Sequence, residues 1–491
     1  MPYKNKCFST CREFEKEECN PPRCKYINGP TLEYCRISHK YKMNKPKCNV
    51  TRRIKKSEQK AYATNKIGEM IKRSGKFLQT ICSDSGDCIS FGSKVDEITN
   101  FFNGFTNFTY ALSPINRLGK PSANGFVKEI AYEKQGYKAH AILKSSQNPT
   151  ADNLVYEYLV GIKFVNRIVK QFPCFVQTYG LYFYNSEESW KIMKGSGPIH
   201  KSNLKNLNKQ ESIDYGKACT ESKYASILIQ HVKDAKPLSD LLSVGTYTRF
   251  IKNDLLYVLF IVYQALASLS SVFTHYDLHT GNVLLYEPVK GKYVQYNYHQ
   301  ADGSTIVFYL PYIVKIIDYG RSFFDNGNVN SRKIYEKICT VNECKPECGA
   351  YSGLGWLNPT PELFISSSQK NESHDLRLGK TIQGNMEHIL NIVHTKPINP
   401  TFIETDKILN KIAYGSGIHN KDFLQFGTRE NLKVNAKKKI YNVNSLYKEL
   451  KKAVTMPGVI SENMKNYSRI TNFLGSFHIY HDGRPMKYDA M

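Results

Sequence analysis

The stretch HYDLHTGN at residues 275–282 constrains this chain more than any other. An apolar run at 283–285 follows it, and a second apolar run at 314–317 leads into Asp318 and Gly320. Asp277 and Asn282, five residues apart on a tight loop, can face one pocket. The second run delivers another carboxylate to the same place, and Gly320 allows a sharp turn there. Because carboxylate and amide oxygens bind Mg²⁺ and a carboxylate can accept a hydroxyl proton, the spacing predicts a base and two metal ligands.

Composition sets limits on the partners. The 491 residues allow up to about three domains. The formal net charge is +25, and residues 1–60 alone hold 16 Lys/Arg against 6 Asp/Glu. A solvated basic surface is the favoured explanation of this excess, and binding of acidic proteins or nucleic acid is the alternative.

Two features bear on membranes and secretion. The start MPYKNKCFSTCREFEKEE has no apolar core behind its charges, so no secretory signal is expected. Residues 255–273 carry no charge and are long enough to span a bilayer, but serine, glutamine and tyrosine dilute their hydrophobicity. We therefore expect a buried helix and no membrane association.

Residues 1–50 are expected to form a small basic, cysteine-rich module, which is too short to support its own core without a metal or disulfides. Zinc held by Cys7, Cys11, Cys19 and Cys24, disulfides, and reduced thiols all stay open, because the spacings match no strong zinc-finger pattern. A connector at 51–104 follows, and residues 466–491 are expected to be a tail.

Residues 115–132 predict a strand, a small-residue turn and a second strand, which can lay backbone N–H groups over phosphates. Residues 138–144 alternate like a half-buried strand that ends in Lys144. Helical periodicity at 151–169 then places Glu157 where its carboxylate can pair with that lysine. Further strands are expected at 175–183 and 227–232, around a basic insertion at 185–223.

In this order the pieces resemble the eukaryotic-type protein kinase family over roughly residues 115–380, with HYDLHTGN and DYG as its catalytic loop and metal-binding element. The form HxDLHxxN is similar to haspin-like protein kinases and also occurs in aminoglycoside and choline phosphotransferases. The resemblance implies an α+β, bilobal fold: an antiparallel-sheet N-lobe with one main helix at 105–232, and a larger, mostly helical C-lobe at 233–465.

The resemblance also implies roles. Asp277 would be the catalytic base, Lys144 would neutralise ATP phosphates, and Asn282 and Asp318 would hold Mg²⁺. Nucleotide-binding positions would be Gly119, Ser122, Gly125 and Val127 in the glycine-rich loop, Glu157 beside Lys144, and Gln230 and Val232 in the hinge. The middle glycine of that loop falls near Ser122, and the spacing is one residue long.

Later motifs resemble the same family. The stretch NPTPEL at 358–363 is similar to its Ala-Pro-Glu anchor, with Glu362 in a structural role. Asp375 matches an aspartate that supports the catalytic loop. Cys339, Cys344 and Cys348 form a triplet for which free thiols are favoured over zinc.

The expected activity is ATP-dependent transfer of the γ-phosphate to Ser/Thr hydroxyls of proteins. The DYG glycine and the PE anchor favour a protein acceptor over a small molecule; a small-molecule phosphotransferase and a catalytically dead binding module are the alternatives. Tyr276 replaces the usual arginine, so activity is expected without phosphorylation of the activation segment.

The cysteine-rich start joined to a divergent kinase resembles serine/threonine kinases of large cytoplasmic DNA viruses such as iridoviruses. Segments that carry this likeness are PPRCKYING at 21–29 and YCRISHKYK at 34–42. It implies a cytoplasmic location, in the host cytoplasm or the virion.

Overall fold

The computed structural model describes residues 24–28, 33–37, 80–122, 125–147, 152–213, 223–242, 248–338, 357–358, 365–392, 399–414 and 440–490. The chain divides into two compact units, Met1–Met70 and Ile71–Met491. In the first unit, β1 (Cys24–Asn28) and β2 (Glu33–Ile37) pair antiparallel. The candidate zinc ligands Cys7, Cys11 and Cys19 lie outside the described residues, as does the side chain of Cys24.

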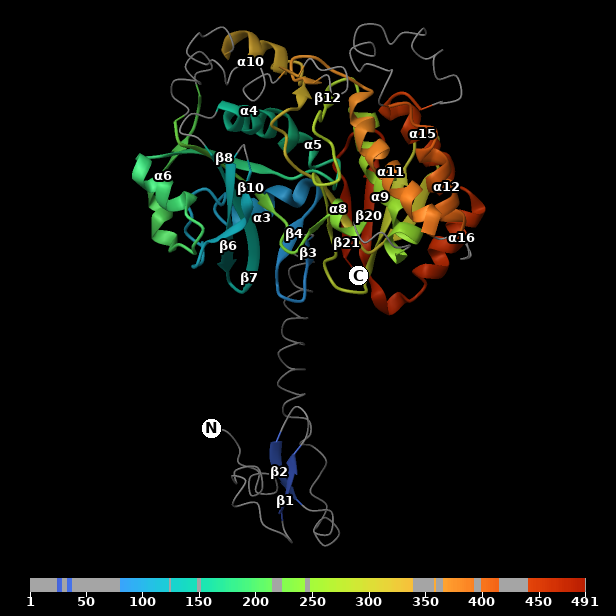
Figure 1. The fold of residues 1–491 in the computed structure, drawn as a ribbon, viewed down its shortest axis with the longest axis horizontal. Helices are drawn as coiled ribbons and strands as arrows, with labels where there is room; N and C mark the ends of the chain where they lie inside the picture. The colour runs from blue at the N-terminus through green and yellow to red at the C-terminus, as the bar shows by residue number, and fades with distance from the viewer. Residues whose placement is uncertain are drawn as a thin grey trace. The chain divides into compact units, whose positions relative to one another are not determined.

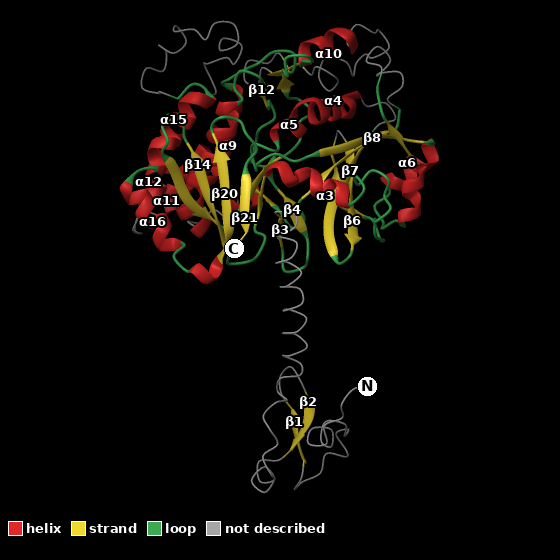
Figure 2. Cartoon of the chain, turned by 180° about the vertical axis from the view of Figure 1, so that it is seen from behind, coloured by secondary structure: helices red, strands yellow, loops and turns green. Residues whose placement is uncertain are grey.

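The second unit is a mixed α+β body, as predicted. Figures 1 and 2 place a strand-rich part on one side and the helices α11, α12, α15 and α16 on the other. The strand-rich part contains a six-stranded antiparallel sheet in the order β5-β6-β7-β10-β8-β9. Its strands are β5 (Asn116–Ser122), β6 (Gly125–Lys134), β7 (Tyr137–Ser146), β8 (Thr178–Tyr184), β9 (Leu207–Gln210) and β10 (Ala225–His231).

Alternating apolar residues explain this sheet. In β7, Ala139, Ala141 and Leu143 are buried, so one face of the strand enters the core. The strands expected at 115–132, 138–144, 175–183 and 227–232 are confirmed with small shifts of their ends. The described part of the expected insertion adds β9 to the sheet edge and contains α6 (Glu187–Lys194).

The helix expected at 151–169 is present but interrupted. It comprises α4 (Asp152–Val160), a π-helical turn (Gly161–Val165) and α5 (Asn166–Ile168). The turn packs tightly, since a Cβ on Gly161 would lie 2.1 Å from the side-chain oxygen of Thr178. Single π turns inside helices often accompany functional sites.

The helical side is built around α9 (Leu255–Ser268), whose residues are almost all buried. The buried helix expected here is confirmed. Within the described chain, the segment Phe250–Ser268 has the length and hydropathy to cross a membrane, yet 89% of it is buried inside the body, as in the core helix of a soluble protein. The surrounding helices are α11 (Arg377–Ile392), α12 (Pro400–Leu409), α15 (Val443–Val454) and α16 (Pro457–Asn466).

A four-stranded sheet in the order β15-β14-β20-β21 corrects one prediction. Within this sheet, β14 (Tyr293–His299) and β15 (Thr305–Leu310) form an antiparallel hairpin. The expected tail at 466–491 is wrong, because β20 (Phe473–Tyr480) pairs parallel with β14, and β21 (Lys487–Ala490) pairs with β20. Burial of Phe477 and Tyr488 holds these strands in place.

The expected connector at 51–104 also needs correction, since its last part belongs to the body. Residues 80–104 form β3 (Thr80–Cys82), β4 (Cys88–Ser90) and α3 (Val95–Phe101), with Phe91 and Phe102 buried. A disulfide joins Cys82 to Cys88 across the β3–β4 pair.

Candidate functional site

Two short paired strands bring the predicted metal ligands together. β13 (Val283–Tyr286) begins directly after Asn282, and β16 (Ile313–Ile316) ends two residues before Asp318. The strands are antiparallel, and the N–H of Ile317 donates to the carbonyl of Asn282 at 3.0 Å. The backbones that carry both residues are therefore neighbours, although they are far apart in sequence.

His275 links the HYDLHTGN loop to the same place. Its Nε2 lies 3.0 Å from the carbonyl of Ile317, and its Nδ1 lies 3.3 Å from the N–H of Asp277. A carbonyl only accepts and an N–H only donates, so His275 is the neutral tautomer with the proton on Nε2. Complete burial agrees with this, because it lowers the pKa of His275 to about 4.

Asp375 holds the loop from the other side. Its carboxylate accepts the N–H of His275 at 2.8 Å and the N–H of Tyr276 at 3.0 Å. Burial raises the pKa of Asp375 to about 7, and the two N–H donors act against that rise. The expectation that Asp375 supports the backbone of the HYDLHTGN loop is confirmed.

Lys144, Glu157 and Asp318 form what we call the Lys144 cluster. The Lys144 Nζ lies 2.7 Å from Glu157 Oε2 and 2.8 Å from Asp318 Oδ1. The Glu157 side chain is 3% exposed and that of Asp318 is 36% exposed, so the cluster opens to solvent on the Asp318 side. The ion pair predicted between Lys144 and Glu157 is confirmed.

Each charge in the cluster alters the others. Burial acts to lower the pKa of Lys144, but the two carboxylates outweigh it and raise that pKa. Burial acts to raise the pKa of Asp318, but the Lys144 ammonium outweighs burial and lowers that pKa. Burial raises the pKa of Glu157, against the effect of Lys144. The ammonium therefore stays charged between its two partners.

Two arginines that the sequence analysis did not single out hold Asp277. The Nη1 of Arg321 lies 3.0 Å and that of Arg377 3.5 Å from Asp277 Oδ1. These three residues form the Asp277 cluster. Arg321 directly follows Gly320, so its place in the sequence was an available signal; Arg377 offered none, because it begins a separate helix.

His279 accepts the N–H of Gly281 through Nδ1 at 3.0 Å, and burial lowers its pKa.

Backbone strain coincides with these groups. Tyr276 has φ 63° and Asp318 has φ 70°, both in the left-handed region that non-glycine residues rarely adopt. Such residues cost of the order of 1–3 kcal/mol each and gather at functional sites. Tyr319 fixes the second of them, since its hydroxyl donates to the Ile316 carbonyl at 2.7 Å and accepts the Val176 N–H at 3.1 Å.

The glycine-rich loop positions lie beside Lys144. Val127 on β6 is the direct strand partner of Lys144 on β7. Ser122 pairs with Gly125 at the end of the β5–β6 hairpin, whose two tip residues are outside the described chain. Gly119 has φ +63°, and a Cβ at Gly125 would lie 2.3 Å from the Ser145 carbonyl oxygen, so both positions favour glycine.

The expected hinge residues follow β10. Ile227 on that strand pairs with Lys144, so the hinge starts close to the Lys144 cluster. The backbone N–H of Gln230 already donates to the Gln177 carbonyl at 2.8 Å, which leaves that N–H unavailable to a nucleotide. Val232 is 3% exposed and belongs to the core.

The oxygen donors present suit Mg²⁺. The amide nitrogen of Asn282 donates to the Asp277 carbonyl at 2.9 Å, so its amide oxygen remains for a metal. Asp318 gives Oδ1 to Lys144 and keeps its second oxygen. Mg²⁺ is typically held by one or two protein oxygens with water and phosphates completing its shell. Among the residues that the structure describes, no group of three or more His, Cys, Asp or Glu side chains is arranged to hold a metal.

Three expected features lie outside the described residues: Glu362 with most of its anchor motif, the cysteine triplet at 339–348, and the tip of the glycine-rich loop. No model of a known protein family matches this sequence, and no curated protein matches it either.

Proposed function

We propose that this chain is a protein kinase that transfers the γ-phosphate of ATP to Ser/Thr hydroxyls, and that its α+β body is a divergent bilobal kinase fold. The observation that carries the proposal is the contact of Lys144 with both Glu157 and Asp318. These three residues come from β7, α4 and the end of β16, and a fold needs no such meeting of charges for stability alone.

The geometry supports a division of labour. Lys144 is held charged, which suits it to neutralise nucleotide phosphates. Asn282 and Asp318 would hold Mg²⁺, which would offset the phosphate charge that builds up during transfer. Asp277 lies on the same loop as Asn282, and its carboxylate oxygens have the free electron pairs that a base needs to take up the hydroxyl proton.

In the transfer step, the acceptor oxygen bonds to the γ-phosphorus while the bond from that phosphorus to ADP breaks. Asp277 accepts the proton that leaves the hydroxyl. Arg321 and Arg377 orient its carboxylate. Catalysis then comes mainly from positioning and charge neutralisation.

Labelled ATP and Mg²⁺ test the proposal. Wild type, Asp277→Ala and Asp318→Ala would be compared on a basic protein and on small alcohols. The expected result is label on protein residues with wild type only. Transfer to small alcohols alone would indicate a small-molecule phosphotransferase, and ATP binding without turnover would indicate a binding module; both outcomes contradict the proposal.

A further inference from the structure

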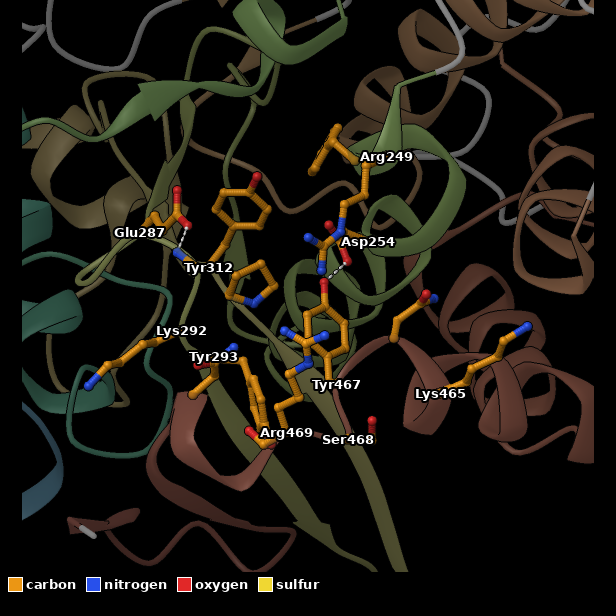
Figure 3. Close-up of a pocket in the computed structure, with 15 residues that line it drawn as sticks. Arg249, Asp254, Glu287, Lys292, Tyr293, Tyr312, Lys465, Tyr467, Ser468 and Arg469 are labelled. Carbon is orange, nitrogen blue, oxygen red and sulfur yellow. Dashed lines mark hydrogen bonds between the residues drawn. The ribbon is translucent and has the colours of Figure 1, made fainter.

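A second concave site lies in the body, away from the Lys144 cluster. It encloses about 420 Å³, within the roughly 300–1,000 Å³ typical of small-ligand pockets. Its walls come from the turn before α9, the β13–β14 connection, the β15–β16 turn and the segment after α16. We call it the Arg249 pocket (Figure 3). The β14–β15 hairpin and the strands after α16, next to which it lies, have no part in the proposed phosphoryl transfer.

Cations outnumber carboxylates in this pocket. Its charged walls are four cations, Arg249, Lys292, Lys465 and Arg469, and two acids, Asp254 and Glu287. Across the described part of the chain, none of the four cations takes part in an ion pair. In Figure 3 the guanidinium groups of Arg249 and Arg469 point toward the middle of the set, and the two lysines lie at its margins.

Both carboxylates already have partners. The buried Asp254 accepts the hydroxyl of Tyr467, and burial raises the pKa of Asp254 to about 7. Glu287 accepts the N–H of Gly291 at 2.8 Å. The acids are therefore engaged in shaping the pocket, and they do not neutralise its cations one for one.

Two tyrosines contact the arginines, Arg249 through its guanidinium and Arg469 through its backbone carbonyl. The Arg249 guanidinium carbon lies 5.4 Å from the centre of the Tyr467 ring. The hydroxyl of Tyr293 donates to the Arg469 carbonyl at 3.0 Å, and the Tyr293 and Tyr467 rings are 5.4 Å apart. Arginines positioned in this way can bind phosphate oxygens with two parallel hydrogen bonds each.

We propose that the Arg249 pocket binds a small molecule that carries two or more phosphate groups. Four cations call for several negative charges, and a phosphate monoester brings about −1.5 to −2 each at neutral pH. The volume suits a compact ligand. A carboxylate or a single orthophosphate would leave most of the cations unpaired.

Two short strands, β13 and β16, connect the pocket to the proposed Mg²⁺ ligands. Glu287 follows the last residue of β13, and Tyr312 precedes the first residue of β16. Asn282 and Asp318 lie at or beyond the opposite ends of these strands. Each strand is four residues long, roughly 13 Å. A ligand in the pocket would thus fix the ribbon that carries both proposed Mg²⁺ ligands.

Isothermal titration with inorganic pyrophosphate, without Mg²⁺ and at fixed salt, tests the site on the full chain. Arg249→Ala with Arg469→Ala is expected to weaken binding at least tenfold. The matched control, Lys448→Ala with Lys452→Ala, removes the same charge from the surface of α15 and should bind like wild type. Pyrophosphate bound at the proposed nucleotide site would be weakened by Lys144→Ala, so the affinity that is lost in the arginine variant should persist in Lys144→Ala, which distinguishes the two sites.

Three results would overturn the proposal: no binding to wild type, equal loss in the Lys448/Lys452 control, or loss in Lys144→Ala with the arginine variant unaffected. If the double alanine variant does not fold, Arg249→Lys with Arg469→Lys takes its place. That variant keeps the charges but loses the paired donors, so we expect several-fold weaker binding; unchanged affinity would argue against the arginines.

Discussion

The Lys144 cluster and the Arg249 pocket handle charge in opposite ways. In the first, one ammonium lies within 2.8 Å of two carboxylates, which keep it charged. In the second, arginines and lysines face a cavity, while the nearby acids are occupied by Tyr467 and a backbone N–H. The cluster pairs its ammonium without a ligand, whereas none of the described carboxylates forms an ion pair with the four cations of the pocket.

This difference separates two kinds of functional residue. A network whose charges are all paired is prearranged for a reaction, because its groups need not reorganise when substrate arrives. A cavity with excess charge indicates binding and implies nothing about reaction. Substitutions should therefore affect turnover in the cluster and affinity or stability in the pocket.

Removing the central cation should have the largest effect. Lys144→Met leaves Glu157 and Asp318 facing each other without their shared partner, and we expect phosphoryl transfer to fall about 100- to 1000-fold. The measurement is initial rate with labelled ATP. Lys138→Met, on the same strand, is the control and should keep most of the activity; a Lys144→Met enzyme as active as that control would break the comparison.

Removing a contact that orients Asp277 should have a smaller effect on phosphoryl transfer. Arg321→Ala removes the closer of the two guanidinium contacts to Asp277, and Arg377 remains. A charge-assisted hydrogen bond is worth about 1.5–3 kcal/mol, so we expect a fall in kcat of about tenfold or somewhat more. Steady-state kinetics would measure it, and a change in KM alone would show that Arg321 binds substrate without orienting the base.

The pocket side is tested by the pH dependence of stability. The folded-state pKa of Asp254 is about 7, above its usual 3.8, so the native state binds the extra proton between those values. Stability from this group is present below about pH 4 and is lost as pH rises through about 7. Asp254→Asn should remove this dependence, which we expect to be of the order of 4 kcal/mol.

Urea unfolding of both proteins at several pH values would measure that difference. The free energy of unfolding of wild type should fall relative to Asp254→Asn between pH 4 and pH 7. If the free energy of unfolding of wild type stays constant or rises relative to Asp254→Asn over this range, Asp254 is ionised in the folded protein.

Removal of phosphate groups from the protein is expected to have no effect on its activity. Tyr276 replaces an arginine that could pair with a phosphorylated residue, and it is buried with its hydroxyl donated to the Gln369 carbonyl at 2.7 Å. Phosphatase treatment should therefore leave the initial rate unchanged. Complete loss of activity after that treatment would show that another cation serves a phosphorylated segment.

Local patterns predicted the parts of the molecule that depend on local chemistry. The uncharged run at 255–273 identified the buried α9, and alternation identified β7 with Lys144 at its buried end. The HYDLHTGN and DYG motifs identified the residues that β13 and β16 bring together, because short spacings and turn residues determine their positions. The nucleotide and metal roles of these residues stay predictions.

Long-range pairing was beyond this reasoning. Nothing near Phe473–Tyr480 indicates that this strand pairs in parallel with a hairpin far upstream, so the segment resembled a tail. The contacts of Arg321 and Arg377 with Asp277 depend on three segments meeting. The disulfide between Cys82 and Cys88 depends on β3 and β4 packing in the body, which the polar sequence before them obscured.

The parallel pairing of β14 with β20 has a consequence for biosynthesis. The side chain of Asn297 donates a hydrogen bond to the carbonyl of Phe477, which is synthesised 180 residues later. This hydrogen bond therefore cannot form until Phe477 has been added to the chain. At translation rates of about 5–20 residues per second, that delay is roughly 10–40 s. During this interval the β14 edge of the hairpin has unpaired backbone N–H and C=O groups, which makes it prone to aggregation. The wall of the Arg249 pocket that contains Arg469 is made in the same late step.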